Sequence, residues 1–167
     1  MYQRTEEQHT ISLLVSNRPG VLIRIALVFS RRGYNLESVV VSPTHRREFS
    51  RMNLVATGDR EILSQVIRQL DRLVDVIHVA DHTGEETVEG EIAFVKVACP
   101  QATRTELMQI ADHFRARSVD LGEDSITFEA TGTTAKLNAF VLMLEKYGIL
   151  ECVRSGKLVM ARGRKDT

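Results

Sequence analysis

The segment Asn17–Leu22 (Asn-Arg-Pro-Gly-Val-Leu) has the residue types and spacing that could bind a small carboxylate. It lies between an alternating strand over 9–15 and an amphipathic helix. Pro19 has no N–H to lose and fits the first turn of that helix, and Gly20 lets another molecule approach the backbone closely. The first N–H groups of a helix have no internal partners and carry the positive end of its dipole. The segment therefore predicts a carboxylate site, and the alternative is a plain helix start with Asn17 as N-cap.

The composition is typical of a soluble intracellular protein. The 167 residues allow one domain or two small ones, and 22 Lys and Arg balance 22 Asp and Glu. No overall charge would therefore recruit nucleic acid or an acidic membrane surface. Cys99 and Cys152 are too few for a disulfide framework, and we expect both to be buried. No charged-then-apolar leader opens the chain, and no apolar run reaches the roughly 18 residues of a membrane helix, so we expect a cytoplasmic protein.

Hydrophobic periodicity in the first half predicts the order strand, helix, strand, strand, helix, strand. The first helix is expected to run to Arg32, with Gly33 at its C-terminal cap. The second helix is expected to begin after Asp59, which can serve as its N-cap. The four strands are expected over 9–15, 36–42, 51–57 and 74–80.

The same order repeats after a polar, Gly-bounded stretch over 83–90, which we expect to be a linker. Thr103 and Glu106 have the spacing of a capping box, and Thr133 begins a second apolar helix. The strands of this half are expected over 91–99, on either side of a turn at 122–124, over 149–153 and, at an edge, over 158–161. We therefore predict an α+β protein with two ferredoxin-like βαββαβ sandwiches in tandem, over 1–82 and 91–167.

The chain resembles a known family. Asn17–Leu22 is similar to the opening signature of ACT domains, which bind amino acids. Residues 29–38 (Phe-Ser-Arg-Arg-Gly-Tyr-Asn-Leu-Glu-Ser) narrow the resemblance to the regulatory (small) subunit of acetohydroxyacid synthase, also called acetolactate synthase. Other similar segments lie at 50–52, 73–76, 114–116, 148–151, 154–156 and 161–163. Because the resemblance spans nearly the whole chain, it implies an ACT domain over 1–82 and the C-terminal domain of the small subunit over 91–167.

Two positions and one turn depart from the pattern of that family. Ser16 stands where the family usually has Glu, and Ile23 where it usually has a small residue. The turn over 45–48 (His-Arg-Arg-Glu) is basic, whereas it tends to be acidic in relatives. These differences bear on the affinity and selectivity for an effector rather than on membership of the family.

The resemblance implies regulation of branched-chain amino acid biosynthesis rather than catalysis by this chain. The catalytic large subunit of the family carries thiamine diphosphate and Mg²⁺, usually with FAD, and joins pyruvate to a second 2-oxoacid with loss of CO₂. The small subunit raises that activity and, in many members, lets valine inhibit it. No cofactor is therefore expected in this chain.

The resemblance also implies a homodimer formed through the ACT domain, with the effector at the interface. One wall of the site would consist of Asn17, Gly20, Val21, Leu22 and Ile23, and Asn35 would come from the other protomer. Backbone N–H groups at the helix start can take the carboxylate of an amino acid, and the carboxamide oxygens of the two asparagines can accept from its ammonium. The alternative for Asn35 is an ordinary turn residue.

No active site is predicted within this chain. The five histidines are scattered, no Cys/His spacing fits a metal site, and no nucleophile elbow, P-loop or dinucleotide fingerprint occurs. RNA-recognition modules share the strand and helix order, but they stack bases on aromatic residues of their central strands. The strands over 9–15 and 51–57 contain no aromatic residue. A free-standing amino-acid sensor is a closer alternative, and the resemblance of the second half to the small subunit argues against it.

Overall fold

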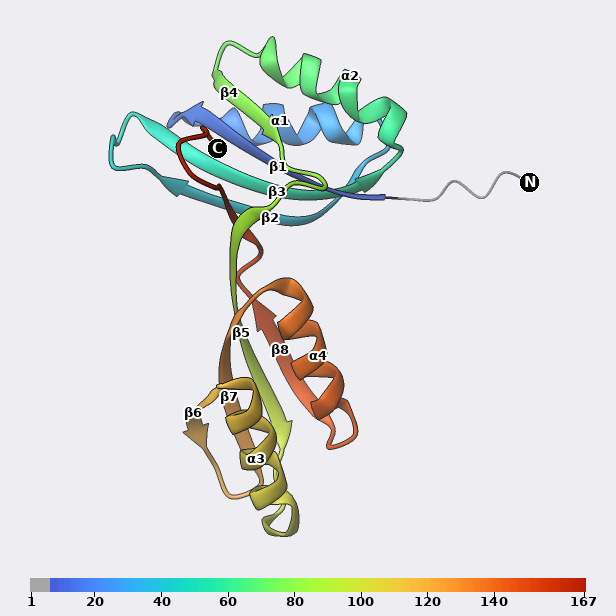
Figure 1. The fold of residues 1–167 in the computed structure, drawn as a ribbon, viewed down its shortest axis with the longest axis vertical. Helices are drawn as coiled ribbons and strands as arrows, with labels where there is room; N and C mark the ends of the chain where they lie inside the picture. The colour runs from blue at the N-terminus through green and yellow to red at the C-terminus, as the bar shows by residue number, and fades with distance from the viewer. Residues whose placement is uncertain (1–6) are drawn as a thin grey trace, which may run out of the picture. The chain divides into compact units, whose positions relative to one another are not determined.

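The structure, a computed structural model, describes residues 7–167, which form two compact units. The first comprises the described residues up to Val88 together with Lys157–Thr167, and the second comprises Glu89–Gly156. In each unit two helices cover one face of an antiparallel sheet (Figure 1). The predicted α+β architecture with two tandem βαββαβ sandwiches is therefore confirmed.

The first unit has the predicted element order. Its elements are β1 (Glu7–Ser16), α1 (Val21–Ser30), β2 (Asn35–Pro43), β3 (Phe49–Gly58), α2 (Arg60–Asp71) and β4 (Val76–Asp81). The strand order in the sheet is β2-β3-β1-β4, so β2 and β4 are its edges. Asp59 caps α2 as predicted, because its Oδ1 accepts a hydrogen bond of 2.8 Å from the backbone N of Glu61.

The core of the first unit follows from the alternation of its central strands. Ile11 and Leu13 of β1 lie opposite Leu54 and Met52 of β3, and all four are at most 1 % exposed. Successive strand residues point to opposite faces, so these side chains share the face that the helices cover. The helices contribute the apolar stripes Val21, Ile25 and Phe29 in α1 and Leu63, Val66 and Leu70 in α2.

The last residues of the chain cover part of the opposite face of this sheet. Ser38 and Arg51 lie on that face, since Arg51 alternates with the core residue Met52. The backbone N of Lys157 donates to Ser38 Oγ at 3.2 Å, and Arg51 donates to the terminal oxygen of Thr167. The segment between them includes β9 (Leu158–Ala161), which was predicted as an edge strand and pairs with β5.

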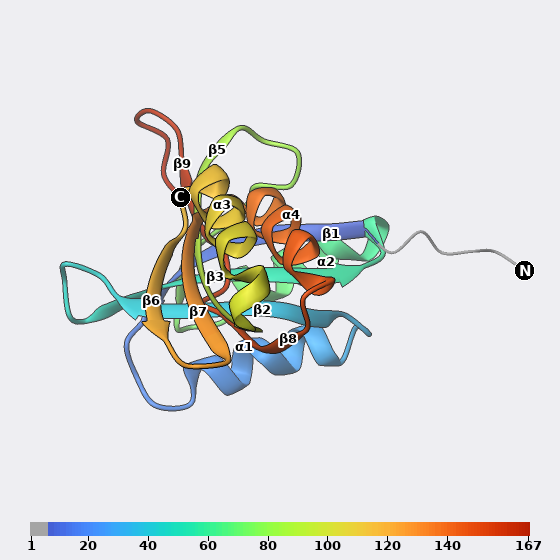
Figure 2. The same cartoon turned by 90° about the horizontal axis from the view of Figure 1, so that it is seen from below.

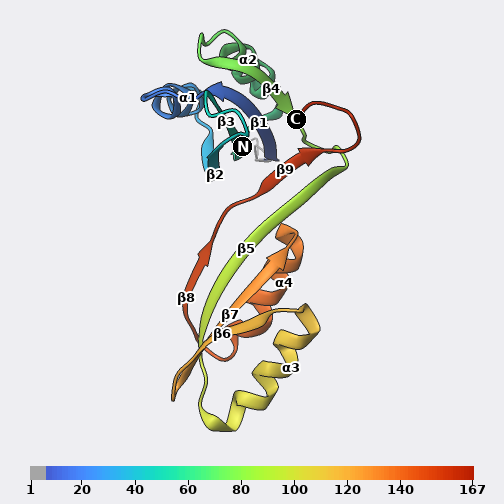
Figure 3. The same ribbon diagram turned by 90° about the vertical axis from the view of Figure 1, so that its left-hand side faces the viewer.

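The second unit repeats the arrangement. Its elements are β5 (Thr87–Ala98), the 3₁₀ turn η1 (Gln101–Thr103), α3 (Arg104–Phe114), β6 (Arg117–Leu121), β7 (Ser125–Gly132), α4 (Thr134–Glu145) and β8 (Ile149–Arg154). Helices α3 and α4 run side by side (Figure 2). The sheet order is β6-β7-β5-β8, and both β8 and β9 pair with β5 (Figure 3).

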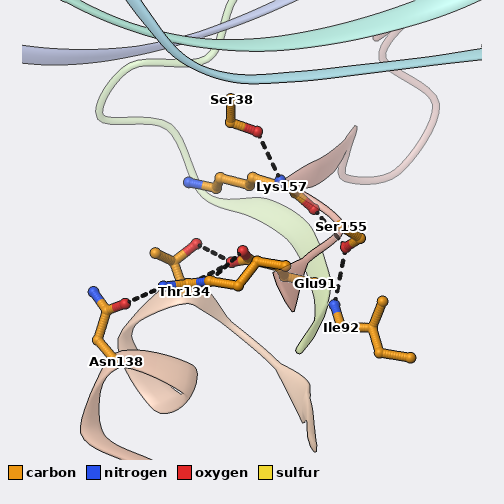
Figure 4. A network of polar contacts seen from close by, with 9 residues as sticks. Ser38, Glu91, Ile92, Thr134, Asn138, Ser155 and Lys157 are labelled. Carbon is orange, nitrogen blue, oxygen red and sulfur yellow. Dashed lines mark hydrogen bonds and ion pairs between the residues drawn. The ribbon is translucent and has the colours of Figure 1, made fainter. Parts of the chain in front are cut away.

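A buried ion pair fixes α4 on its sheet (Figure 4). Arg154 of β8 donates to both carboxylate oxygens of Glu91 in β5, at 2.7 and 2.8 Å. Thr134 of α4 donates to the same carboxylate at 3.1 Å, and Arg154 also donates to Asn138 Oδ1 at 2.6 Å. The side chain of Glu91 is 6 % exposed. Every polar group of this pair is thus engaged, as a buried charge requires.

Several local expectations differ from the structure. The first helix does not run to Arg32 but ends at Ser30. The capping box does not form, because the Thr103 hydroxyl donates to the carbonyl of Pro100 in the preceding 3₁₀ turn. Cys99 is buried as expected, whereas Cys152 is exposed.

The boundaries of the units also lie elsewhere than the expected 1–82 and 91–167. Residues 87–90 of the expected linker begin strand β5, and residues 157–167 group with the first unit. Residues 1–6 lie outside the part of the chain that the structure describes. Over residues 7–167, no helix is long and apolar enough to span a bilayer.

Candidate effector site

The connection between β1 and α1 is anchored by Asn17. Its backbone N donates to the carbonyl of Glu48 at 2.7 Å, and its Nδ2 donates to the carbonyl of Arg47 at 3.0 Å. Both carbonyls belong to the loop between β2 and β3. The alternative of Asn17 as N-cap is wrong, since α1 begins at Val21 with Gly20 at the cap position and no side chain caps the helix. The carboxamide oxygen has no donor within residues 7–167 and can accept from a ligand.

Gly20 is the residue that caps α1. Its φ of +84° lies in the left-handed region, which glycine adopts without a steric penalty. Pro19 precedes this residue and lies in the turn before the helix rather than in its first turn. Within residues 7–167, the backbone N–H groups of Leu22 and Ile23 have no backbone acceptor, and no side chain caps the helix. Two unpartnered N–H groups at the positive end of the helix dipole can hold an anion.

The predicted wall residues divide into two kinds. Val21 is 4 % exposed and points into the core, so it can offer a ligand only its backbone. Leu22 is 48 % exposed and Ile23 is 66 % exposed, so both offer apolar surface beside the helix start. The structure thus brings Asn17, Gly20, Leu22 and Ile23 together at one end of α1.

Asn35 lies at the opposite end of that helix, at the start of β2. Its Nδ2 donates to Glu37 Oε1 at 2.5 Å. The ten residues of α1 extend over about 15 Å, so Asn35 and Asn17 of one chain do not meet. A site that contains both asparagines therefore needs a second copy of the chain.

Tyr34 fixes the backbone just before Asn35. Its side chain is buried against Phe29 and His9, with ring centroids 6.2 and 6.0 Å away. Its hydroxyl donates to the carbonyl of Asp59. Burial raises the pKa of Tyr34, and the nearby carboxylates of Asp59 and Asp81 raise it further.

Two charged residues at the site were missed by the sequence reasoning. Arg24 Nη2 donates to Asp75 Oδ2 at 2.5 Å, beside Gly20. The spacing of four residues between Gly20 and Arg24 was a usable signal, because a helical side chain extends back over the preceding turn. Asp75 lies in the segment 73–76 that resembles the family, but nothing in that segment indicates a partner for its carboxylate. The part of the chain that is described holds no cluster of three His, Cys, Asp or Glu residues suited to a metal ion.

Comparisons with known proteins agree with the resemblance. A model described as the AHAS small subunit-like ACT domain matches residues 11–78, and one described as the small subunit of acetolactate synthase matches residues 90–163. A probable acetolactate synthase small subunit of Archaeoglobus fulgidus is 44 % identical over 95 % of this chain and 99 % of its own. The acetolactate synthase small subunit of Mycolicibacterium smegmatis is 40 % identical over 93 % of this chain and 91 % of its own.

A solved structure agrees as well. The acetolactate synthase small subunit from Thermotoga maritima is 31 % identical, has a TM-score of 0.84, and aligns over 95 % of this chain and 99 % of its own. Sequence and fold therefore match the same kind of protein over about 95 % of the chain, and the chain belongs to the family of acetolactate synthase small subunits.

Proposed function

We propose that this chain regulates acetolactate synthase in the cytoplasm. It raises the activity of the catalytic large subunit, which converts two pyruvates into 2-acetolactate and CO₂, and it confers feedback inhibition by valine. Thiamine diphosphate, Mg²⁺ and FAD belong to that partner. The observation that carries this proposal is the start of α1, where unpartnered backbone N–H groups, the Asn17 oxygen and exposed apolar side chains lie together.

Each part of a valine molecule has a counterpart at this site. The N–H groups of Leu22 and Ile23 take the carboxylate at the helix start. The carboxamide oxygen of Asn17 accepts from the ammonium. The exposed side chains of Leu22 and Ile23 cover the isopropyl group, which loses its contact with water.

A second copy of the chain completes the site through the edge strand β2. Val39 and Val41 lie opposite Leu54 and Met52 of the core, so they are on the helix-covered side of the sheet. Leu22, Ile23 and Leu27 of α1 are exposed apolar side chains as well, and we propose that they and the two valines share one dimer interface, here called the α1–β2 patch. An exposed edge strand beside exposed apolar side chains is typical of a protein–protein interface, and we propose a second copy of the chain as the partner.

The register of that pairing explains how Asn35 reaches the site. If β2 pairs antiparallel with β2 of a second copy about its middle residue, Val39, then Asn35 of that copy lies opposite Pro43. Pro43 leads into the loop whose carbonyls hold Asn17. Asn35 of one copy and Asn17 of the other are therefore brought to the same end of the interface.

The test is a reconstituted synthase with and without valine. We expect Gly20→Asp to abolish valine inhibition and leave activation of the large subunit largely intact, because a side chain at Gly20 fills the approach to the helix start. Calorimetry should show valine binding to the unsubstituted chain and none to the variant. Equal valine affinities would place the effector elsewhere.

Affinity capture from native lysate separates this proposal from a free-standing amino-acid sensor. Recovery of a thiamine diphosphate-dependent synthase with the chain is the expected result. Repeated recovery of the chain alone, together with valine binding, would favour the sensor.

A further inference from the structure

One arginine lies directly against the start of α1. Arg24 is four residues after Gly20, and its side chain extends back over the first turn of the helix. A Cβ atom added at Gly20 would lie 3.1 Å from Arg24 Nη1. The guanidinium therefore borders the space through which a ligand would approach the Gly20 backbone.

Asp75 holds this guanidinium in place. The ion pair between Arg24 Nη2 and Asp75 Oδ2 is 2.5 Å long, and the two side chains are 47 % and 10 % exposed. Asp75 is itself fixed, because its backbone carbonyl accepts a hydrogen bond of 2.8 Å from the N of Ser16. One edge of the guanidinium is thus committed to a nearly buried carboxylate, while Nη1 remains on the side of Gly20.

We propose that Arg24 binds the carboxylate of the effector and that Asp75 positions Arg24 for this contact, an inference that rests on the proposed function. A guanidinium has five donors and can serve two carboxylates through separate N–H groups. A carboxylate at the helix start meets Arg24 Nη1 as well as the N–H groups of Leu22 and Ile23. The site then selects 2-amino acids with a free carboxylate over the corresponding amides.

The same geometry gives a second reason for the expected effect of Gly20→Asp. The new carboxylate would lie within reach of Arg24 Nη1, since even a Cβ atom lies 3.1 Å from it. The variant would therefore carry an internal competitor for the guanidinium that the effector needs.

The test compares valine with valinamide, which keeps the ammonium and the isopropyl group but lacks the carboxylate. In calorimetry on the full chain, valine should bind at least tenfold more tightly than valinamide. Arg24→Gln should lose at least tenfold in valine affinity and change valinamide affinity less than twofold. Arg18→Gln removes the same charge from the adjacent exposed loop and should change both affinities less than threefold.

A measurement on the unsubstituted chain covers the case in which Arg24→Gln fails to fold. The Nε resonance of Arg24, assigned by its absence from the spectrum of Arg24→Lys, should shift on addition of valine and not of valinamide. If Arg24→Gln binds valine as tightly as the unsubstituted chain, or if the resonance does not shift, the role of Arg24 is overturned. Valine binding by the unsubstituted chain would still uphold the proposed function in that case. No binding of valine by the unsubstituted chain would overturn both.

Discussion

Single residues in the first unit are fixed by close packing around Tyr34. The Tyr34 ring lies over Gly58 at the end of β3, where an added Cβ atom would be 2.5 to 2.7 Å from three of its ring carbons. The ring cannot move aside easily, because its hydroxyl is bound to Asp59 and the ring packs beside those of Phe29 and His9. Gly58 is thus required for space rather than for an unusual backbone conformation.

We therefore expect Gly58→Ala to lower the free energy of unfolding by about 1–3 kcal/mol, the usual cost of overpacking a core. Gly90→Ala is the matched control, since an added Cβ there meets no atom within 4 Å. It should change stability by less than about 0.5 kcal/mol. Denaturant unfolding of the two variants measures the difference, and equal stabilities would show that the Tyr34 ring shifts freely.

The raised pKa of Tyr34 predicts a loss of stability in alkali. Because the folded chain keeps the phenol neutral, its contribution is complete below the usual tyrosine pKa of about 10 and is lost as the pH rises above it. Tyr34→Phe should be less stable than the unsubstituted chain by about 1 kcal/mol at pH 8, through the lost hydrogen bond. The gap should shrink at pH values above about 10. Denaturant unfolding of both chains between pH 8 and pH values above about 10 measures this difference in the free energy of unfolding. A difference that stays constant over this range would contradict the raised pKa of Tyr34.

At the scale of elements, periodicity predicted most helices and strands, since the apolar core residues of a strand such as β1 recur at every second position, as Ile11, Leu13 and Val15 do. The errors come from side chains that bond outside their own segment. Asn17 resembles an N-cap in sequence, but α1 begins at Val21 with Gly20 at the cap position, and the Asn17 Nδ2 group donates to the loop after β2 instead. Thr103 had the spacing of a capping box, but a 3₁₀ turn redirects its hydroxyl to Pro100. Such competition between local and distant partners cannot be read from spacing alone.

The prediction of the candidate site from the sequence has the same limit. The backbone N–H groups at the helix start could be predicted, because the glycine that precedes the helix is a local feature of the sequence. The pairing of Arg24 with Asp75 joins residues 51 positions apart and depends on how β4 begins beside α1. The burial of Val21, which leaves it only a backbone role, follows from where the helix begins relative to the sheet.

The α1–β2 patch carries the prediction on assembly. Ile23→Glu should convert a dimer into a monomer in sedimentation at micromolar concentration, because a carboxylate in an apolar interface would be buried without a partner. The fold itself should remain, since Ile23 is 66 % exposed in the single chain. Val74→Glu is the control, as Val74 is 95 % exposed in the loop before β4 and should leave the dimer unchanged. A monomeric unsubstituted chain, with or without valine, would contradict the proposed interface.

At the scale of the whole molecule, the first unit is built from two separate parts of the sequence. Residues 157–167 belong to it, and Val159 and Ala161 are only 6 % and 8 % exposed. On the sheet face opposite the helices, Ser12 and Asn53 are 0 % and 4 % exposed. A chain cut at residue 82 therefore lacks a segment that belongs to the first unit. A loss of regulation in that fragment could come from the missing segment, so it would not assign a function to the second unit.

A closed version of the first unit avoids this problem. The backbone N of Ser155 donates to the carbonyl of Ile92 at 2.9 Å, so the two strands lie side by side there. Joining Ile92 to Ser155 through an inserted Asn-Gly pair would close a hairpin and keep residues 157–167. We expect the closed unit to unfold cooperatively and the fragment 1–82 to be less stable by at least about 2 kcal/mol, because it loses buried apolar contacts.

The closed unit then tests how regulation is divided between the two units. An effector between two ACT units acts at a distance only if it favours one arrangement of the dimer, and the second unit is proposed to stabilise that arrangement. With saturating closed unit, the large subunit should keep measurable activation and lose most valine inhibition. The measurement is the synthase rate with and without valine, with valine binding to the closed unit determined in parallel. A closed unit that folds and binds valine but does not activate would place the contact with the large subunit in residues 93–154, which it lacks, and the division of roles would be reversed.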